Sequence, residues 1–161
     1  MAISNLITRV GRETLDKRLK FLWKQERPRV TKIVSWAASL GDRSDNADYK
    51  ENKHLLRTID REIRFLVKRL EVLEIVDYNP QQDGTVYFGA YAELEDDDGT
   101  VIQCRIVGRD ELDSKRNFVT VDSPMAKALI GKQVDDEAIV HTPAGSKTWY
   151  INKIQYLPFT A

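Results

Sequence analysis

The sequence predicts an α+β protein in which an N-terminal antiparallel two-helix coiled coil precedes a C-terminal domain of antiparallel β-sheet with one short helix. Three observations lead to this prediction. Apolar residues recur every three or four positions in the first half of the chain and every second position in the second half. The charge divides at the same place, because residues 1–76 carry 17 Lys+Arg against 11 Asp+Glu and residues 77–161 carry 8 against 14. We therefore expect two modules, 1–76 and 77–161, with different partners.

The first helix is expected to begin after Thr8, a suitable N-cap residue, and to end before Gly41. Pro28 lacks a backbone N–H and its ring clashes with the preceding turn, so we expect a kink or short break near residues 26–29. The apolar face of this helix comprises Leu15, Leu19, Leu22, Val30, Ile33, Ala37 and Leu40.

The second helix is expected over about residues 46–75, a length of about 45 Å at 1.5 Å per residue. Such a long helix needs a partner for its apolar stripe, and the first helix has the matching length. The connection through Gly41 is short, so the two helices must form an antiparallel hairpin with its tip at residues 41–49. Its heptad-like seam comprises Leu55, Ile59, Ile63, Leu66, Leu70 and Leu73.

The second module alternates apolar and polar residues in short runs separated by turn signals. Asp98-Gly99 is expected to close the first pair of strands and residues 143–145 the last. Ser123 as N-cap, Pro124 in the first turn and Gly131 after the end predict a short helix over 123–131. The expected strands cover residues 85–94, 101–107, 117–121, 138–141 and 148–156.

Composition excludes several classes of function. No apolar run approaches the about 20 residues of a membrane span, and the first residues lack a signal-peptide pattern, so we expect a cytoplasmic protein without membrane contact. The single cysteine, Cys104, alternates with two isoleucines and is expected to be buried and inert. His54 and His141 have no second ligand at metal-binding spacing, and no phosphate-binding loop or nucleophile elbow is present.

The turn at the hairpin tip carries acidic side chains that can converge. Asp42 and Asp45 lie three residues apart around a helix start. One interpretation is structural, with one carboxylate as an N-cap and the other favouring the helix dipole. The other is coordination of a hard cation such as Mg²⁺, with further ligands supplied by a partner.

Cations recur along the second helix and form a stripe that leads away from the tip. Few acids interleave with them: Glu51, Asp60 and Glu62. A stripe of this kind is either a solvated face or a contact for the phosphates of a single-stranded nucleic acid. Its members are Lys50, Lys53, Arg57, Arg61, Arg64 and Lys68, named below the basic stripe.

The tip segment Asp42-Arg43-Ser44-Asp45-Asn46-Ala47-Asp48-Tyr49 closely resembles the tip signature of the bacterial Gre transcript-cleavage factors, most of all the GreB branch. The resemblance extends over nearly the whole chain. Its further segments are residues 76–78, 84–90, 105–108, 122–126 and 142–145.

This resemblance implies a coiled coil that enters the secondary channel of bacterial RNA polymerase and an FKBP-like domain that docks on the channel rim. It implies a factor that stimulates the polymerase's own cleavage of the RNA 3′ end in backtracked complexes, and not an enzyme in its own right. Asp42 and Asp45 would then hold Mg²⁺ shared with the polymerase. The residues implied to support the tip are Arg43, Ser44, Asn46 and Tyr49.

By the same resemblance the basic stripe contacts the nascent RNA 3′ end, and Asp122, Ser123 and Pro124 dock on the polymerase. The chain departs from the family at Asp45, where glutamate is usual, which shortens the reach of the carboxylate by about 1.5 Å. A regulator that occupies the channel without stimulating cleavage is the alternative function. A third, a prolyl isomerase with a chaperone arm, is disfavoured because the second half lacks an aromatic-rich pocket signature. We expect the free protein to be monomeric.

Overall fold

A computed structural model describes residues 4–41 and 46–159 of the chain. The chain divides into two units. One is Arg12–Leu73, and the other is discontinuous, because it combines the residues up to Gly11 with those from Glu74 onward. This division differs from the expected one at residue 76 because the N-terminal residues pack in the globular unit. Strand β1 (Leu6–Ile7) pairs in parallel with β2 (Glu74–Ile75), and Ile7 is fully buried.

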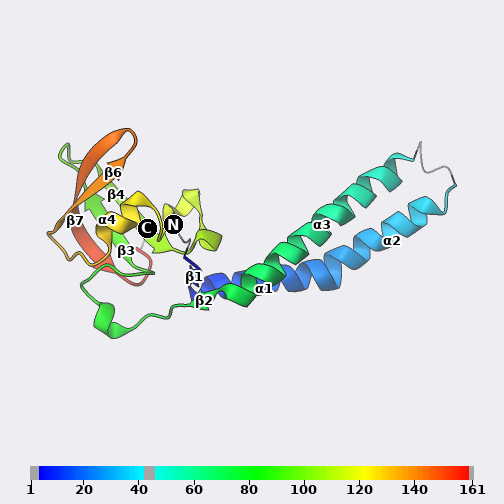
Figure 1. The fold of residues 1–161 in the computed structure, drawn as a ribbon, viewed down its shortest axis with the longest axis horizontal. Helices are drawn as coiled ribbons and strands as arrows, with labels where there is room; N and C mark the ends of the chain where they lie inside the picture. The colour runs from blue at the N-terminus through cyan, green and yellow to red at the C-terminus, as the bar shows by residue number, and fades with distance from the viewer. Residues whose placement is uncertain (1–3, 42–45, 160–161) are drawn as a thin grey trace. The chain divides into compact units, whose positions relative to one another are not determined.

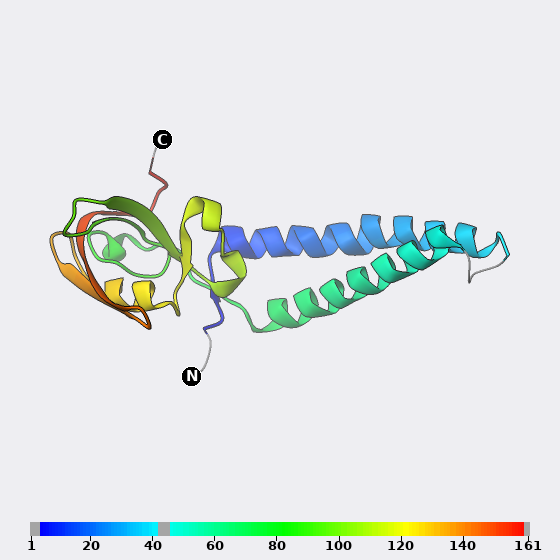
Figure 2. The same cartoon turned by 90° about the horizontal axis from the view of Figure 1, so that it is seen from above.

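The unit Arg12–Leu73 is the predicted antiparallel helical hairpin. Its first arm runs from α1 (Arg9–Phe21) through a π-helical turn (Leu22–Glu26) into α2 (Arg27–Ala38), and its second arm is α3 (Ala47–Val72). Figures 1 and 2 show α2 and α3 side by side in both views. Thr8 is the predicted N-cap, since its hydroxyl oxygen accepts the N–H of Gly11 at 3.1 Å.

The hairpin buries a single apolar seam, and two positions of the predicted seam are wrong. Leu55 is 37% exposed, and Leu56 packs in its place because it continues the alternation of three and four residues through Ile59. On the first arm Val34 packs against the core while Leu40 is exposed. The buried residues of the seam are Leu22, Val30, Ile59, Ile63 and Leu66.

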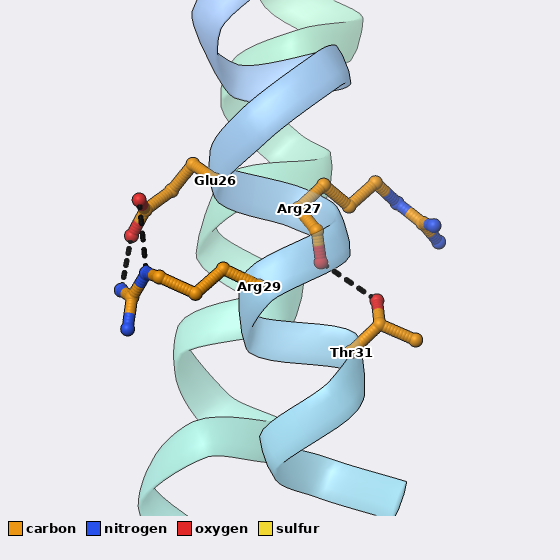
Figure 3. A network of polar contacts seen from close by, with 4 residues as sticks. All are labelled: Glu26, Arg27, Arg29 and Thr31. Carbon is orange, nitrogen blue, oxygen red and sulfur yellow. Dashed lines mark hydrogen bonds and ion pairs between the residues drawn. The ribbon is translucent and has the colours of Figure 1, made fainter.

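The interruption expected near Pro28 takes the form of a π turn that ends just before it. The N–H of Arg27 donates to the carbonyl of Leu22, five residues back, and Pro28 follows without an N–H to give. Figure 3 shows the start of α2: Glu26 and Arg29 form an ion pair at 2.5 Å, and Thr31 donates to the carbonyl of Arg27 at 2.8 Å. The side chain of Arg27 leaves the helix on the side opposite this ion pair.

The globular unit contains a five-stranded sheet in the order β5-β4-β3-β7-β6. Three pairings are antiparallel, as predicted, and the predicted turns close β3 to β4 and β6 to β7. The fourth departs from prediction: β4 and β5 are parallel, because two 3₁₀ turns between them return the chain before β5 begins. The strands are β3 (Tyr91–Glu95), β4 (Val101–Val107), β5 (Phe118–Thr120), β6 (Glu137–Thr142) and β7 (Gly145–Gln155).

The predicted short helix is α4 (Pro124–Leu129), and the hydroxyl of Ser123 accepts the N–H of Ala126 at 3.1 Å as its cap. The first strand of the sheet begins at Tyr91 and not at residue 85, because Gly89 has a φ of 89° that an extended strand does not allow. Cys104 is buried as expected, and burial raises the pKa of its thiol to about 11. The largest fully buried side chains of this unit are Ile7, Leu94, Ile106, Leu129 and Ile151.

Candidate functional site: the hairpin tip and the cationic face of α3

Four of the predicted tip residues, Asp42, Arg43, Ser44 and Asp45, lie outside the described residues. The structure defines the two ends between which they are held. On the first side, the N–H of Leu40 donates to the carbonyl of Ala37 at 3.2 Å, and Gly41 takes a φ of 103°. This left-handed conformation suits glycine and turns the chain out of α2.

Asn46 closes the second side of the tip by contacting both helices. Its side-chain amide nitrogen donates to the carbonyl of Ala37 in α2 at 2.7 Å, and its side-chain oxygen accepts the N–H of Tyr49 in α3 at 3.1 Å. One side chain therefore gives a carbonyl at the end of one helix a further hydrogen bond and satisfies a free amide at the start of the other. This contact fixes the first described residue after Asp45 against α2.

Tyr49 and Lys53 form a second local contact at the start of α3. The ammonium group of Lys53 donates to the phenol oxygen of Tyr49 at 2.9 Å and lies 5.1 Å from the centroid of the ring. The two residues are one helical turn apart, so they meet on the same face of α3. Asp48 lies in the first turn of this helix, and its side chain is exposed.

The six cations of the basic stripe are all exposed on α3. Each residue of an α-helix turns by about 100°, so steps of three and four keep the stripe on one face. The seam residues Ile59, Ile63 and Leu66 lie on the opposite face by the same count. The stripe is thus turned away from α2.

Two of the three acids that interleave with the stripe, Asp60 and Glu62, are paired with arginines of the first arm. Arg27 donates to the Asp60 carboxylate at 2.8 Å. Arg18 holds Glu62 in a bidentate pair, with nitrogen–oxygen distances of 2.9 and 3.1 Å. A bidentate arginine neutralises a carboxylate with defined geometry. Both acids are therefore compensated across the hairpin and not by the basic stripe.

Within residues 4–41 and 46–159, no cation of the basic stripe forms an ion pair. Arg61 donates to the hydroxyl of Thr58 at 3.2 Å, and Lys53 to Tyr49 as described above. A row of cations with no compensating carboxylates produces a positive potential along one face of the helix. Such a face attracts a polyanion that can follow the helix axis.

The third predicted site, Asp122, Ser123 and Pro124, lies in the globular unit at the start of α4. The Asp122 carboxylate accepts the N–H of Ser4 at 3.1 Å, and Pro124 is exposed. A hollow of about 620 Å³ opens between α4 and β6 beside these residues. Among the side chains that line it are Asp122, Pro124, Lys127, Ile139 and His141.

The described residues contain neither a cluster suited to a metal ion nor a helix suited to a membrane. Outside the tip residues 42–45, no group of three or more His, Cys, Asp or Glu side chains is arranged to hold a metal ion. None of the helices in the described part of the chain has the length and apolar character to cross a membrane.

Two parts of this arrangement were not found from the sequence. Arg18 and Arg27 belong to the positive first half but lie on a different helix from the acids they neutralise, so no local spacing connects them. The bond from Asn46 to Ala37 spans the turn, and the sequence indicated Asn46 only as a tip residue. One signal in the sequence could have located these ion pairs. It is the presence of acids beside the predicted seam of one arm together with arginines at facing positions of the other arm.

These features define a class: a protein with a helical hairpin that presents an acidic turn and an uncompensated cationic face, joined to a small α+β domain. Residues 5–75 match the family model described as transcription elongation factor, N-terminal, and residues 81–156 match that of transcription elongation factor, GreA/GreB, C-term. The chain belongs to the GreA/GreB family of transcription elongation factors.

Relatives named transcription elongation factor GreB align over almost their full length. The protein of Haemophilus ducreyi is 60% identical over 97% of this chain and 96% of its own, and that of Haemophilus influenzae is 60% identical over 97% and 99%. The protein of Vibrio cholerae is 56% identical over 95% and 96%. Among solved structures, Thermus aquaticus Gfh1 is 26% identical over 95% of this chain and 99% of its own, with a TM-score of 0.44.

Proposed function

We propose that the protein is a transcript-cleavage factor of the GreB type, which inserts its hairpin into the secondary channel of bacterial RNA polymerase. There it stimulates the polymerase's own endonucleolytic cleavage of the RNA 3′ end in backtracked complexes, and it is not itself an enzyme. The names of the relatives support this function, since the alignments with them cover at least 95% of this chain. The observation that carries it is a helical hairpin whose arms are joined by an acidic segment of the sequence and whose second arm carries a cationic face without ion pairs among the described residues.

The basic stripe serves as the contact for the extruded RNA. Single-stranded RNA carries one phosphate per nucleotide, and exposed lysines and arginines at regular steps can neutralise several of them in succession. Because Asp60 and Glu62 are already held by Arg27 and Arg18, the RNA does not have to displace an ion pair to reach the stripe. The stripe runs toward the tip, so it guides the RNA end toward Asp42 and Asp45.

The tip acids are proposed to hold Mg²⁺ in company with the polymerase. Carboxylate oxygens are donors that suit this hard cation, but two of them are an incomplete set, so the remaining ligands come from the polymerase, substrate and water. When bound, the ion polarises a phosphoryl oxygen and favours attack by water. This chain's contribution is to place the Asp42 and Asp45 carboxylates. Asn46, which follows them in the sequence, fixes the start of α3 against α2.

The globular unit is proposed to dock on the polymerase through Asp122, Ser123 and Pro124. The hollow between α4 and β6 supports this role, because it offers an exposed proline and isoleucine beside charged side chains. A partner surface with a protruding apolar residue and a polar rim fits such a site. We place the protein in the cytoplasm with the polymerase, as a monomer when free.

A cleavage assay on a stalled, backtracked elongation complex tests this function. The protein should release short 3′ RNA fragments, and Asp42→Asn should abolish release while leaving polymerase binding intact. Asp48→Asn is the matched control, because Asp48 is an exposed acid in the first turn of α3 and should retain full activity. Equal cleavage by Asp42→Asn and wild type would contradict the tip mechanism. Inhibition of nucleotide addition without fragments would instead identify a regulator that only occupies the channel.

A further inference from the structure

Phe65 lies beside the basic stripe and outside the apolar seam. Phe65 is 54% exposed, although its neighbour Leu66 is 4% exposed in the seam. Residues three and four apart are neighbours on a helix surface, so Arg61 and Lys68 lie on either side of Phe65 along α3. The phenyl ring is thus part of the cationic face.

The ring of Phe65 differs from those of Phe21, Trp23 and Tyr49 in the same hairpin, each of which has a cation over it. A cation lies over the ring of Phe21, Trp23 and Tyr49, at distances from the centroid of 5.7, 5.8 and 5.1 Å. In the described part of the chain, no cation or second ring lies against Phe65. Its ring is therefore available to an external group.

We propose that Phe65 is a stacking platform for one unpaired base of single-stranded RNA whose phosphates follow the basic stripe. This inference rests on the RNA contact proposed above and adds to it a contact with the base. Proteins that bind single strands without sequence preference combine a cationic track for the backbone with aromatic side chains for the bases. Phe65 and the stripe supply both elements on one face of α3.

The charge around Phe65 favours RNA over an apolar protein surface as the occupant. An apolar partner covering the ring would also desolvate the side chains of Arg61, Arg64 and Lys68, which have no carboxylates to compensate them within the described residues. Burying uncompensated cations is costly. A nucleotide brings a phosphate with the base, so it covers the ring and compensates the charge together.

Binding of short oligoribonucleotides to the purified full-length protein tests the proposal. The probes are a fluorescein-labelled oligouridylate of about 12 nucleotides and an abasic strand of the same length and charge. Phe65→Leu should weaken binding of the oligouridylate about tenfold and leave binding of the abasic strand unchanged, whereas Phe65→Trp should bind the oligouridylate at least as tightly as wild type. Leu55→Ala is the control, because Leu55 is an exposed apolar residue of α3 that has no residue of the stripe three or four positions away.

Salt dependence separates the base contact from the phosphate contacts. Phe65→Leu should lower affinity without changing the slope of log K against log salt concentration, whereas Arg64→Gln should reduce the magnitude of that slope by about 0.7. Equal oligouridylate binding by Phe65→Leu and wild type would overturn the proposal, as would an equal loss with both probes. Weaker polymerase binding by Phe65→Leu with unchanged oligouridylate binding would overturn it in favour of a protein contact.

The outcome does not depend on the cleavage assay. Polymerase is absent from the oligonucleotide experiment, so a Phe65 effect there would remain even if the protein failed to stimulate cleavage. Conversely, normal cleavage by wild type together with oligouridylate binding that is insensitive to Phe65 would reject the stacking platform alone. Because Phe65 is outside the seam, the helical circular dichroism signal of each variant should match that of wild type.

Discussion

Glu111 and Thr8, 103 residues apart in the chain, are joined by two hydrogen bonds: one carboxylate oxygen accepts the N–H of Thr8 at 3.1 Å, and the other accepts its hydroxyl. The first oxygen also accepts the N–H of Gly108 at 2.9 Å. Glu111 thus satisfies two backbone amides of the globular unit that would otherwise be left in a partly buried site.

Replacing Glu111 by alanine should destabilise the globular unit. Two partly buried amides and the Thr8 hydroxyl lose their acceptor, and an unsatisfied buried donor costs about 1–3 kcal/mol. We expect a loss of about 2 kcal/mol in the free energy of unfolding, measured by urea denaturation. Glu111→Gln retains one acceptor oxygen, so its loss in the free energy of unfolding should be smaller. A loss under 0.5 kcal/mol for Glu111→Ala would contradict this role.

Two nearby glycines should differ in their tolerance of alanine. A Cβ at Gly108 would lie 2.0 Å from the carbonyl oxygen of Leu6, which is backbone, whereas a Cβ at Gly11 would lie 2.1 Å from the end of the Glu111 side chain. Backbone cannot move without disturbing β1, whereas the Glu111 side chain can rotate away, which costs only its bonds to Thr8 and Gly108. We expect Gly108→Ala to cost about 3 kcal/mol and Gly11→Ala clearly less, by comparison of thermal unfolding curves. Equal costs would show that both sites yield in the same way.

Loss of the Asn46 side chain should loosen the tip of the hairpin. Asn46→Ala removes an N-cap and the bond to Ala37, at a cost of about 1–2 kcal/mol. Hydrogen exchange at the Tyr49 amide should accelerate in this variant. Asn46→Asp retains the acceptor for Tyr49 but has no N–H for the Ala37 carbonyl. Its exchange rate at the Tyr49 amide should therefore lie between those of Asn46→Ala and wild type. Unchanged exchange at Tyr49 in Asn46→Ala would contradict the bridging role.

Lengthening the side chain at position 45 should improve retention of the shared ion. If Asp45 helps to hold Mg²⁺ with polymerase, the extra methylene of Asp45→Glu extends the reach of the carboxylate by about 1.5 Å. We expect a lower Mg²⁺ concentration for half-maximal transcript cleavage, measured by titrating Mg²⁺ in the cleavage assay. Asp48→Glu serves as the control. The prediction fails if the Asp45→Glu and wild-type titrations coincide.

Acid should weaken the globular unit in part through Asp96. Its buried carboxylate accepts the N–H groups of Thr100 and Asp98 and pairs with Lys147 at 3.1 Å. The hydrogen bond from Thr100, and then that from Lys147, hold the pKa of Asp96 below its ordinary value.

Because the folded-state pKa is lowered, this stabilisation is present above the unfolded-state pKa of about 3.9 and is lost as pH falls through the folded-state value. Asp96→Asn should therefore lose less stability than wild type between pH 7 and pH 3, as measured by urea denaturation at both values. Asp98 is an exposed neighbour, so Asp98→Asn should lose as much stability between the two pH values as wild type does. Identical pH dependence of Asp96→Asn and wild type would disprove the contribution.

Local sequence information predicted several elements of the fold. Apolar periodicity predicted the two arms of the helical hairpin, and capping and turn residues predicted α4 and the two tight hairpins of the sheet. Periodicity misplaced Leu55, since steps of three and four to Ile59 fit a seam equally well until the partner helix selects Leu56. It also missed the parallel pairing of β5, which depends on where two short turns return the chain. Spacing along the chain does not specify such contacts.

The candidate site was also predictable from the sequence only where it depends on the repeat of a single helix. The six cations of the basic stripe lie on one helix, so their common face followed from the helical repeat alone. Their lack of carboxylate partners within the described residues depends on Arg18 and Arg27 of the other arm, which neutralise the competing acids through tertiary contacts. The exposed position of Phe65 required knowledge of which neighbour, Leu66, enters the seam.

The parallel pairing of Leu6 with Glu74 has a topological consequence. The chain leaves the globular unit and returns to it at two adjacent strands, so residues 12–73 have the connectivity of an insertion within a domain that is otherwise continuous. An insertion whose ends are neighbours can lengthen or shorten without rearranging its host. The hairpin can therefore gain or lose whole heptads in the course of evolution, and its length can adapt to the depth of a partner while the globular domain keeps its fold.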